Sequence, residues 1–328
     1  MGLIQRFRSR SRDKPQDSVG SRLDFLFGPT DAGKLVNERT SMQVTAVYAC
    51  VRVVAETIAS LPLHVFQENA DGTRERIITH PLYNILRYEP NPEMTSFVFR
   101  ETIVSHLLLW GNCYAQIIRD GRGQVRALYP LLPDRIEVSR NPSGRIIYTY
   151  YPDMDERRIK QDGRQVIFSA DEVFHVPALG FDGLIGYSPI AVARNAIGMA
   201  IAAEEYGSKF FANGARPGGI LQTQKTVKNA EQVRQDWNSL FRGGENSSRI
   251  AVLEEGLEYK PIAVPPNEAQ FLESRKFQLS EIARIFRVPL HMLGDLDRAT
   301  FNNIENLSLD FVKYTLDPWI IPDGVLNP

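Results

Sequence analysis

The sequence predicts an α+β protein, in which a mixed domain is followed by two long helices that flank a small α/β module. Apolar residues recur at helical spacing over residues 42–60 and 96–110, whereas residues 113–177 carry six short β patterns separated by turns. Beyond residue 187 long helical segments lie on either side of residues 213–266. A length of 328 residues suits about two domains.

The first 40 residues show no sustained periodicity, and we expect them to form a flexible arm. Five cations and one carboxylate give the first fourteen residues a charge of +4, so the rest of the chain carries −5 of the total of −1. We interpret the basic start as a solvated tail, with an electrostatic contact as the alternative. The acidic remainder argues against a tight duplex binder, which needs a basic face to neutralise phosphates.

The mixed domain over residues 41–187 begins with helices. A helix over 42–60 is predicted from six apolar positions, and Pro62 follows its end. Residues 63–67 and 74–78 predict a hairpin around Asp71-Gly72. A short helix over 81–86 and a longer one over 96–110, which stops at Gly111, complete this part.

Short antiparallel strands are predicted for the second half of the domain. The expected ranges are 113–119, 124–130, 134–139, 145–151, 164–168 and 173–176. Their connections contain the turn signals Asp120-Gly121, Asn141-Pro142 and Asp162-Gly163.

Residues 188–287 have a different character. Ser188-Pro189 is an N-cap with proline at the first helical position, and the helix expected over 188–212 is rich in alanine and glycine, which permits close helix packing. A module over 213–266 is predicted to contain strands near 220, 249–254 and 257–264 and a helix over 228–242. A helix over 268–287 follows and stops before Val288-Pro289, and a last helix begins near Asn302.

One segment resembles a nucleotide-binding loop. Residues 28–34 match G-x-x-x-x-G-K, but Leu35 stands where Ser or Thr would hold magnesium, and no helical pattern follows Lys34. We expect a glycine-containing loop, with a nucleotide site as the alternative.

No other pattern indicates catalysis, a metal or a cofactor. Cys50 and Cys113 are too few for a cysteine zinc site, and the five histidines form no H-x-x-x-H pair. The segment from Asp295 to Asn306 fails the EF-hand signature. The longest uncharged run, over 102–118, is too short and too polar to cross a membrane.

Eight groups of residues, in order along the chain, resemble the portal proteins of tailed bacteriophages, in the smaller form common in long-tailed phages. They cover residues 41–320. The segments are VYACVR (47–52) with IASLPL (58–63), HPLY (80–83) with PNP (90–92), LLLWGNCY (107–114), LYPL (128–131), GLIGYSPI (183–190), FFANGARPGG (210–219), LEEG (253–256) and IARIFRVP (282–289).

The resemblance implies a particular division of the chain. Residues 1–40 would be the arm and 41–187 the wing domain; 188–212 and 267–287 would be stem helices and 213–266 the clip. Residues 288–301 would be the tunnel loop and 302–320 a wing helix. Because the chain ends nine residues after Trp319, we expect the crown to be absent or truncated.

The resemblance also implies a function without enzymatic activity. The protein would form a ring of twelve subunits at one capsid vertex, through which double-stranded DNA enters in packaging and leaves in ejection. Terminase, a head-completion or tail adaptor, and a capsid or scaffold protein would be its partners, in the host cytoplasm during assembly and then in the virion. The alternative is another ring-forming structural adaptor.

Six residues are candidates for contacts in such a ring. In the tunnel loop, Asp295 and Asp297 would repel phosphate and Arg298 would offer one exchangeable contact. In the clip, the candidates for terminase or adaptor contact are Arg216, Trp237 and Arg242.

Overall fold

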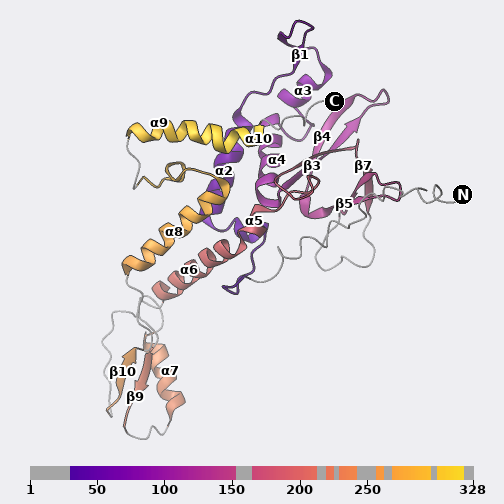
Figure 1. Cartoon of the computed structure of the whole chain (residues 1–328). Helices are drawn as coiled ribbons and strands as arrows, with labels where there is room; N and C mark the ends of the chain where they lie inside the picture. Colours follow the sequence, from indigo (N-terminus) through magenta and orange to yellow (C-terminus); the bar gives the residue numbers. More distant parts are fainter. Residues whose placement is uncertain are drawn as a thin grey trace, which may run out of the picture. The chain divides into compact units, whose positions relative to one another are not determined.

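The computed structural model describes residues 30–152, 165–212, 219–224, 229–241, 256–261, 268–296 and 301–320 (Figure 1). These residues form two compact units. The first comprises residues 36–194 and 283–320, and the second comprises residues 30–35 and 195–282.

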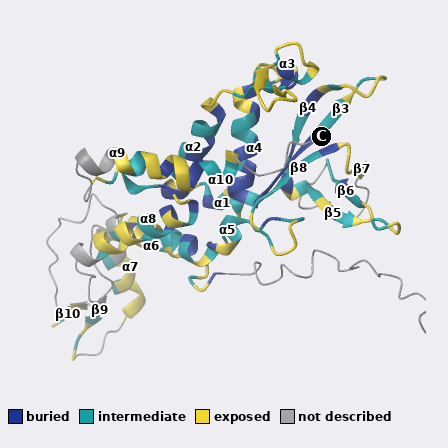
Figure 2. Ribbon diagram, turned by 45° about the horizontal axis from the view of Figure 1, so that its top comes forward, coloured by how far each residue is buried: buried dark blue, intermediate teal, exposed yellow. Residues whose placement is uncertain are grey.

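Two long helices form the helical layer of the first unit. Helix α2 (Thr45–Ser60) packs against α4 (Ser96–Trp110), and Val47 and Val54 are fully buried. Figure 2 shows the buried positions of both helices in dark blue. The sequence predicted α4 correctly, because Thr95 caps its start and Gly111 ends it in a left-handed conformation with φ of 71°.

The start of α2 differs from the prediction. Residues before Thr45 form a separate short helix, α1 (Glu38–Ser41), which a capping box between Asn37 and Thr40 begins. The predicted arm over 1–40 is therefore too long at its end, because residues 38–40 are helical. Residues 1–29 lie outside the described residues.

A three-stranded antiparallel sheet continues directly from α4. Strand β3 (Asn112–Arg119) lies between β4 (Val125–Leu131) and β8 (Val173–Pro177). Leu107 from α4, Cys113 and Ala115 from β3, and Leu128 from β4 share one buried cluster. The helix and the sheet are thus joined by a common core.

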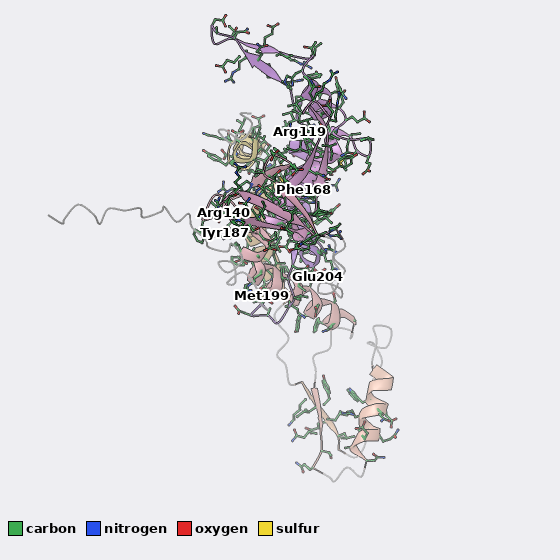
Figure 3. All side chains as sticks on the ribbon, turned by 90° about the vertical axis from the view of Figure 1, so that its right-hand side faces the viewer. Arg119, Arg140, Phe168, Tyr187, Met199 and Glu204 are labelled. Atoms are coloured by element: carbon green, nitrogen blue, oxygen red, sulfur yellow. The ribbon has the colours of Figure 1, made fainter. Side chains whose placement is uncertain are left out.

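A second three-stranded sheet has the order β5 (Ile136–Arg140), β6 (Ile146–Tyr150), β7 (Val166–Ser169). Its core contains Tyr148 and Phe168, and Figure 3 labels the latter. All six strands predicted in this domain are confirmed to within two residues at each end.

The predicted hairpin and the short helix after it are also confirmed. Strands β1 (Phe66–Glu68) and β2 (Arg74–Arg76) pair around the turn at Gly72, whose φ is 81°. Helix α3 (Pro81–Arg87) follows, with Pro81 at its first position and the His80 side chain as its cap.

Hydrogen bonds between side chains and backbone groups join the α4–β3 junction to the segment before α5 (Pro189–Val192). The Asn112 side chain donates to the Gly186 carbonyl at 2.8 Å and accepts from the Gly186 N–H at 2.9 Å. The Ser188 hydroxyl donates to the Leu109 carbonyl at 2.7 Å. These contacts hold together two of the segments on which the sequence resemblance rests.

The predicted helix over 188–212 is interrupted. Ala193 leaves the helical conformation with φ of −90° and ψ of 8°, so α5 is followed by a separate helix, α6 (Arg194–Ala212). The alanine-rich sequence has high helix propensity throughout, and therefore gave no signal of this break.

The second unit contains α6, a small α/β module and most of α8 (Glu268–Phe286). In the module, β9 (Gly219–Gln222) pairs antiparallel with β10 (Glu258–Pro261), and α7 is Ala230–Phe241. These elements confirm the predicted strand near 220, the helix over 228–242 and the strand within 257–264. The strand predicted over 249–254 lies outside the described residues.

The chain returns to the first unit after α8. A 3-10 turn (Leu290–Leu293) leads to α9 (Phe301–Asp310), which continues as a π-helix (Phe311–Leu316) and α10 (Asp317–Ile320). The helix predicted near Asn302 is confirmed. In the part of the chain that the structure describes, no helix has the length and apolar character needed to cross a membrane.

Candidate functional site

The segment predicted as the tunnel loop begins with a tightly closed helix end. The N–H of Val288 donates to the Ala283 carbonyl at 2.9 Å and that of Arg287 donates to the Arg284 carbonyl at 3.2 Å, which is a Schellman motif. Arg287 occupies its left-handed position with φ of 55°, where glycine is usual. This backbone conformation is unfavourable for an L-residue by roughly 1–2 kcal/mol.

A second contact fixes the same corner. Thr315 lies in the π-helix and its hydroxyl donates to the Arg287 carbonyl at 2.5 Å. π-Helical turns are rare and are often found at functional sites. Here the turn brings Thr315 to the end of α8, so the start of the loop is held by the helix that follows it.

A second Schellman motif ends the 3-10 turn at Gly294, directly before Asp295. Gly294 has φ of 83°, and the N–H of Asp295 donates to the Leu290 carbonyl at 3.2 Å, with Gly294 bonding to His291 at the same distance. Asp295 is half-buried. Asp297 and Arg298 lie outside the described residues, so the structure places one of the three predicted tunnel residues.

Of the predicted clip contacts, the structure describes Trp237. Its ring stacks on Tyr259 of β10, with centroids 5.5 Å apart and an interplanar angle of 16°, so α7 and the hairpin pack through these aromatics. Trp237 therefore packs within the module, in addition to the terminase or adaptor contact predicted for it. Arg216 and Arg242 lie outside the described residues.

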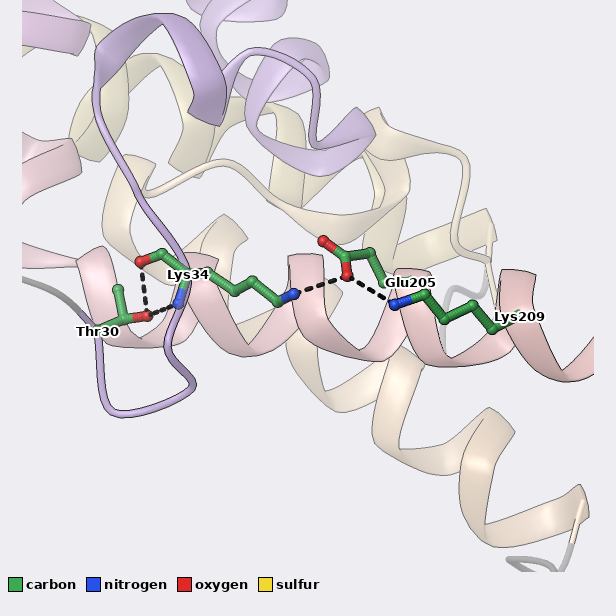
Figure 4. Close-up of polar contacts among 4 residues, drawn as sticks. All are labelled: Thr30, Lys34, Glu205 and Lys209. Carbon is green, nitrogen blue, oxygen red and sulfur yellow. Dashed lines mark hydrogen bonds and ion pairs between the residues drawn. The ribbon is translucent and has the colours of Figure 1, made fainter. Parts of the chain in front are cut away.

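The lysine of the loop that resembles a nucleotide site has an internal partner (Figure 4). Lys34 Nζ lies 2.6 Å from Glu205 Oε2 on α6, and Lys209 approaches the same oxygen at 3.6 Å. The hydrogen bond from Lys34, together with the positive charges of Lys34 and Lys209, holds the pKa of the Glu205 carboxyl below its usual value. As the sequence predicted, no helix begins at Lys34; the next one starts at Glu38.

The same loop is folded back on itself and against α6. The Thr30 hydroxyl donates to the Lys34 carbonyl and accepts from the Lys34 N–H, both at 2.8 Å, and Asn195 donates to Asp31 at 2.9 Å. A Cβ added at Gly198 would lie 2.8 Å from the Thr30 side chain. We call residues 30–35 the strap, since they lie along α6 through these contacts.

Small residues on α6 also allow close approach to α8, as the sequence predicted. A Cβ at Gly207 would lie 2.9 Å from the Phe271 ring, and Tyr206 packs on the same ring at 6.2 Å. Other positions on the helix are exposed, among them Met199 and Glu204 (Figure 3).

Two cysteines and two histidines are buried in the first unit, and burial keeps all four uncharged. Burial raises the pKa of Cys50 and Cys113 to about 12, which makes both thiols unreactive. Burial lowers the pKa of His106 and His175 to about 4, so both are neutral. His175 contacts Tyr148 and Asn112. Among the described residues, no group of three or more His, Cys, Asp or Glu side chains could hold a metal ion.

Sequence reasoning missed the contacts that hold the strap and the loop corner. Lys34 and Glu205, and Arg287 and Thr315, are far apart in sequence and belong to no common motif. The sequence contained one partial signal, since Val288-Pro289 marks the end of α8.

The chain belongs to the phage portal protein family. Residues 45–322 match the family described as "Phage portal protein". The family is structural, and the resemblance inferred from the sequence is thereby confirmed, as is the α+β portal fold.

Known proteins show the same relationship. The portal protein of Enterobacteria phage HK97 is 37% identical over 291 residues, which cover 87% of this chain and 66% of that protein. The probable portal protein of Streptomyces phage phiC31 is 35% identical over 297 residues, which cover 88% of this chain and 64% of that protein. The chain thus spans slightly less than two thirds of the length of these relatives.

A solved structure shares the fold. It is described as the neck of an empty GTA particle computed with C6 symmetry, and matches with a TM-score of 0.61 and 26% identity over 89% of this chain and 78% of that one.

Proposed function

We propose that this protein is a portal subunit that forms the channel for double-stranded DNA at one capsid vertex, in packaging and in ejection. The observation that carries the proposal is the family match over residues 45–322, which spans both long helices and the module between them. The wing, stem, clip and tunnel-loop divisions expected from the sequence belong to this proposal.

A ring of twelve subunits is the proposed assembly. The related neck structure was computed with C6 symmetry, and six-fold rotations are contained in a twelve-fold ring. Such rings form through heterologous contacts, in which different faces of neighbouring subunits meet. Exposed apolar side chains on α6 and α8 suit such contacts, among them Met199 at 55%, Leu272 at 60% and Phe277 at 57% exposure.

In the ring, residues 288–301 would form a collar around the DNA. The two Schellman closures and the Thr315 contact support this proposal, because they give the loop a fixed base at Arg287 and a fixed turn at Gly294. Asp295 and Asp297 would repel phosphate and Arg298 would offer a contact that exchanges readily, so that DNA slides.

The clip, residues 213–266, is the proposed docking surface for terminase and later for a head-completion or tail adaptor, with Arg216, Trp237 and Arg242 as contacts. A capsid or scaffold protein would contact the ring elsewhere. The protein would assemble in the host cytoplasm and remain at the portal vertex of the virion. It would hydrolyse no nucleotide, and the ion pair of Lys34 with Glu205 supports this.

A packaging assay tests the channel. We expect Asp295→Lys combined with Asp297→Lys to slow or stop DNA packaging while rings still assemble, because each added lysine creates a salt-sensitive phosphate contact in every subunit. The defect should lessen as the salt concentration rises. The matched control is Glu89→Lys with Glu93→Lys, which makes the same charge change at exposed positions outside the loop. Normal packaging by the tunnel-loop variant would contradict the collar.

A further inference from the structure

Two large apolar side chains project into solvent from the loop between β8 and α5. Leu179 is 85% exposed and Phe181 84%, and among the described residues no other large apolar side chain is exposed as much. Tyr187, which Figure 3 labels, meets the Phe181 ring edge to face, with the ring centroids 5.0 Å apart. We call residues 178–187 the apolar loop.

Hydrogen bonds fix the conformation of the apolar loop. The Tyr187 N–H donates to the Leu179 carbonyl at 2.8 Å, which closes the loop across its ends. The Asp182 carboxylate accepts from the N–H groups of Leu184 at 2.8 Å and Ile185 at 3.0 Å. A loop that is already ordered loses less conformational entropy when a partner covers it, so this one is preorganised for docking.

The apolar loop presents a surface that is almost without charge. Asp182 is the one charged residue between positions 178 and 187, and its carboxylate is bonded within the loop. Leu179 and Phe181 can therefore be buried against a partner without desolvating an unpaired charge of their own loop. Burial of apolar surface drives most protein association, and aromatic side chains are enriched at the buried centre of such contacts.

A pocket of about 280 Å³ lies between α2 and α4 of the same unit, and Figure 2 shows these two helices side by side. Its most buried lining residues are Val51, Ala55 and His106, at 2%, 1% and 7% exposure. His106 is neutral because burial lowers its pKa to about 4, and its ring meets Trp110 edge to face. The floor of the pocket is thus apolar and aromatic.

The rim of the pocket is polar. Arg52 pairs with Glu56 at 2.7 Å, and this bond, followed by weaker effects that include the charge of Glu101, raises the pKa of Arg52. Tyr48 and the half-buried Thr102 also line the pocket. An apolar centre within a polar rim is the usual composition of a specific contact between proteins.

The pocket has room for an aromatic side chain. A dry cavity of about 150 Å³ is enough to hold benzene, so this pocket can take the Phe181 ring together with part of the chain that carries it. The ring does not fill the pocket of its own chain, because it is exposed. The loop and the pocket share no residue, so one copy can use its loop on one neighbour and its pocket on another.

We propose that Phe181 of one subunit enters the α2–α4 pocket of the next subunit, with Leu179 over the pocket rim. The occupant is a second copy of this chain, because the chain itself carries a preorganised apolar group that suits the pocket in size and charge. The proposal rests on the ring proposed above and names two faces through which its subunits meet. Since these faces differ, the contact is heterologous, and its repetition closes into a ring when the rotation permits.

Cysteine crosslinking tests the contact in the full-length chain. One variant carries Leu179→Cys and a second carries Thr102→Cys, and a short bismaleimide is the crosslinker. Cys50 and Cys113 are fully buried and should not react. We expect a mixture of the two variants to give a crosslinked dimer, and a chain with both substitutions to give a ladder of multimers. Either variant alone should run as a monomer on a denaturing gel, because a heterologous contact does not bring like positions together.

Variants of the aromatic side chain show whether it is the anchor. Phe181→Ala, added to the Leu179→Cys variant, should lower the yield of crosslinked dimer roughly tenfold or more, because the contact loses a buried ring. Phe181→Leu should lower it less. The matched control is Phe66→Ala, which removes another exposed ring of the first unit and should leave the yield within about twofold. Thermal unfolding of each variant checks that the fold is retained.

The outcomes separate this contact from the ring itself. Ring-shaped particles in the electron microscope without a crosslink between positions 179 and 102 would overturn the contact and leave the ring. A ladder of multimers without closed rings would support the contact and contradict the ring, and the absence of both would contradict both. The contact would also be overturned if Leu179→Cys crosslinked with itself, or if Arg122→Cys, on an exposed turn, crosslinked equally well in its place.

Discussion

Gly111 ends α4 in a left-handed conformation that brings the chain against the backbone near Ser188. A Cβ at this position would lie 2.0 Å from the Tyr187 carbonyl oxygen, and a Cβ at Gly186 would lie 2.1 Å from the Gly111 oxygen. The Asn112 side chain bonds both backbone groups of Gly186 in the same place. Gly111, Asn112 and Gly186, which all belong to the recognised segments, therefore hold the start of β3 against the segment before α5.

We expect Gly111→Ala to destabilise the first unit strongly. The left-handed backbone costs an L-residue roughly 1–2 kcal/mol, and overpacking against a fixed carbonyl costs a further 1–3 kcal/mol or so. The free energy of unfolding in urea should fall by about 2–5 kcal/mol. The control is Gly121→Ala, which has open space around the added Cβ and no left-handed backbone. Equal stability of the two variants would contradict the close approach at Gly111.

At the scale of elements, the sequence was most informative where local signals coincide. Helix α4 has a cap at Thr95, a continuous apolar pattern and a glycine stop, and both of its ends were predicted. The six strands were bounded by turn residues. In contrast, α1 is only four residues long, and the break at Ala193 lies within residues of high helix propensity, so neither produces a periodic signal.

The strap lies against α6 at Gly198. We expect Gly198→Ala to displace residues 30–35, because the added Cβ would lie 2.8 Å from both Thr30 Oγ1 and Cγ2. The helix itself should gain about 1 kcal/mol from the substitution, so α6 remains folded. Hydrogen exchange of the Gly33 and Lys34 amides, which bond to Thr30, should become about tenfold faster or more, equivalent to roughly 1.4 kcal/mol.

Gly207→Ala is the matched control for the strap. It changes the same helix, but its added Cβ would meet the Phe271 ring of α8 and not the strap. Exchange at Gly33 and Lys34 should stay as in the unmodified protein. Unchanged exchange in Gly198→Ala, with the Lys34–Glu205 pair intact, would show that the strap does not depend on the helix surface at Gly198.

For the whole molecule, the sequence could predict the family and the order of most helices and strands, because the signals for both are local. It could not predict long-range contacts such as those of Lys34 with Glu205 and Thr315 with Arg287, because the sequence around each residue contains no signal of which distant residue it contacts.

The proposed channel, collar and docking surfaces all depend on assembly of the chain into a ring. Electron microscopy of the purified chain at high concentration, with native mass spectrometry on the same sample, would detect such a ring. We expect ring-shaped particles with a central hole, twelve-fold rotational symmetry and twelve times the chain mass of 37.1 kDa. Rings with a closed centre, or open filaments in place of rings, would contradict it.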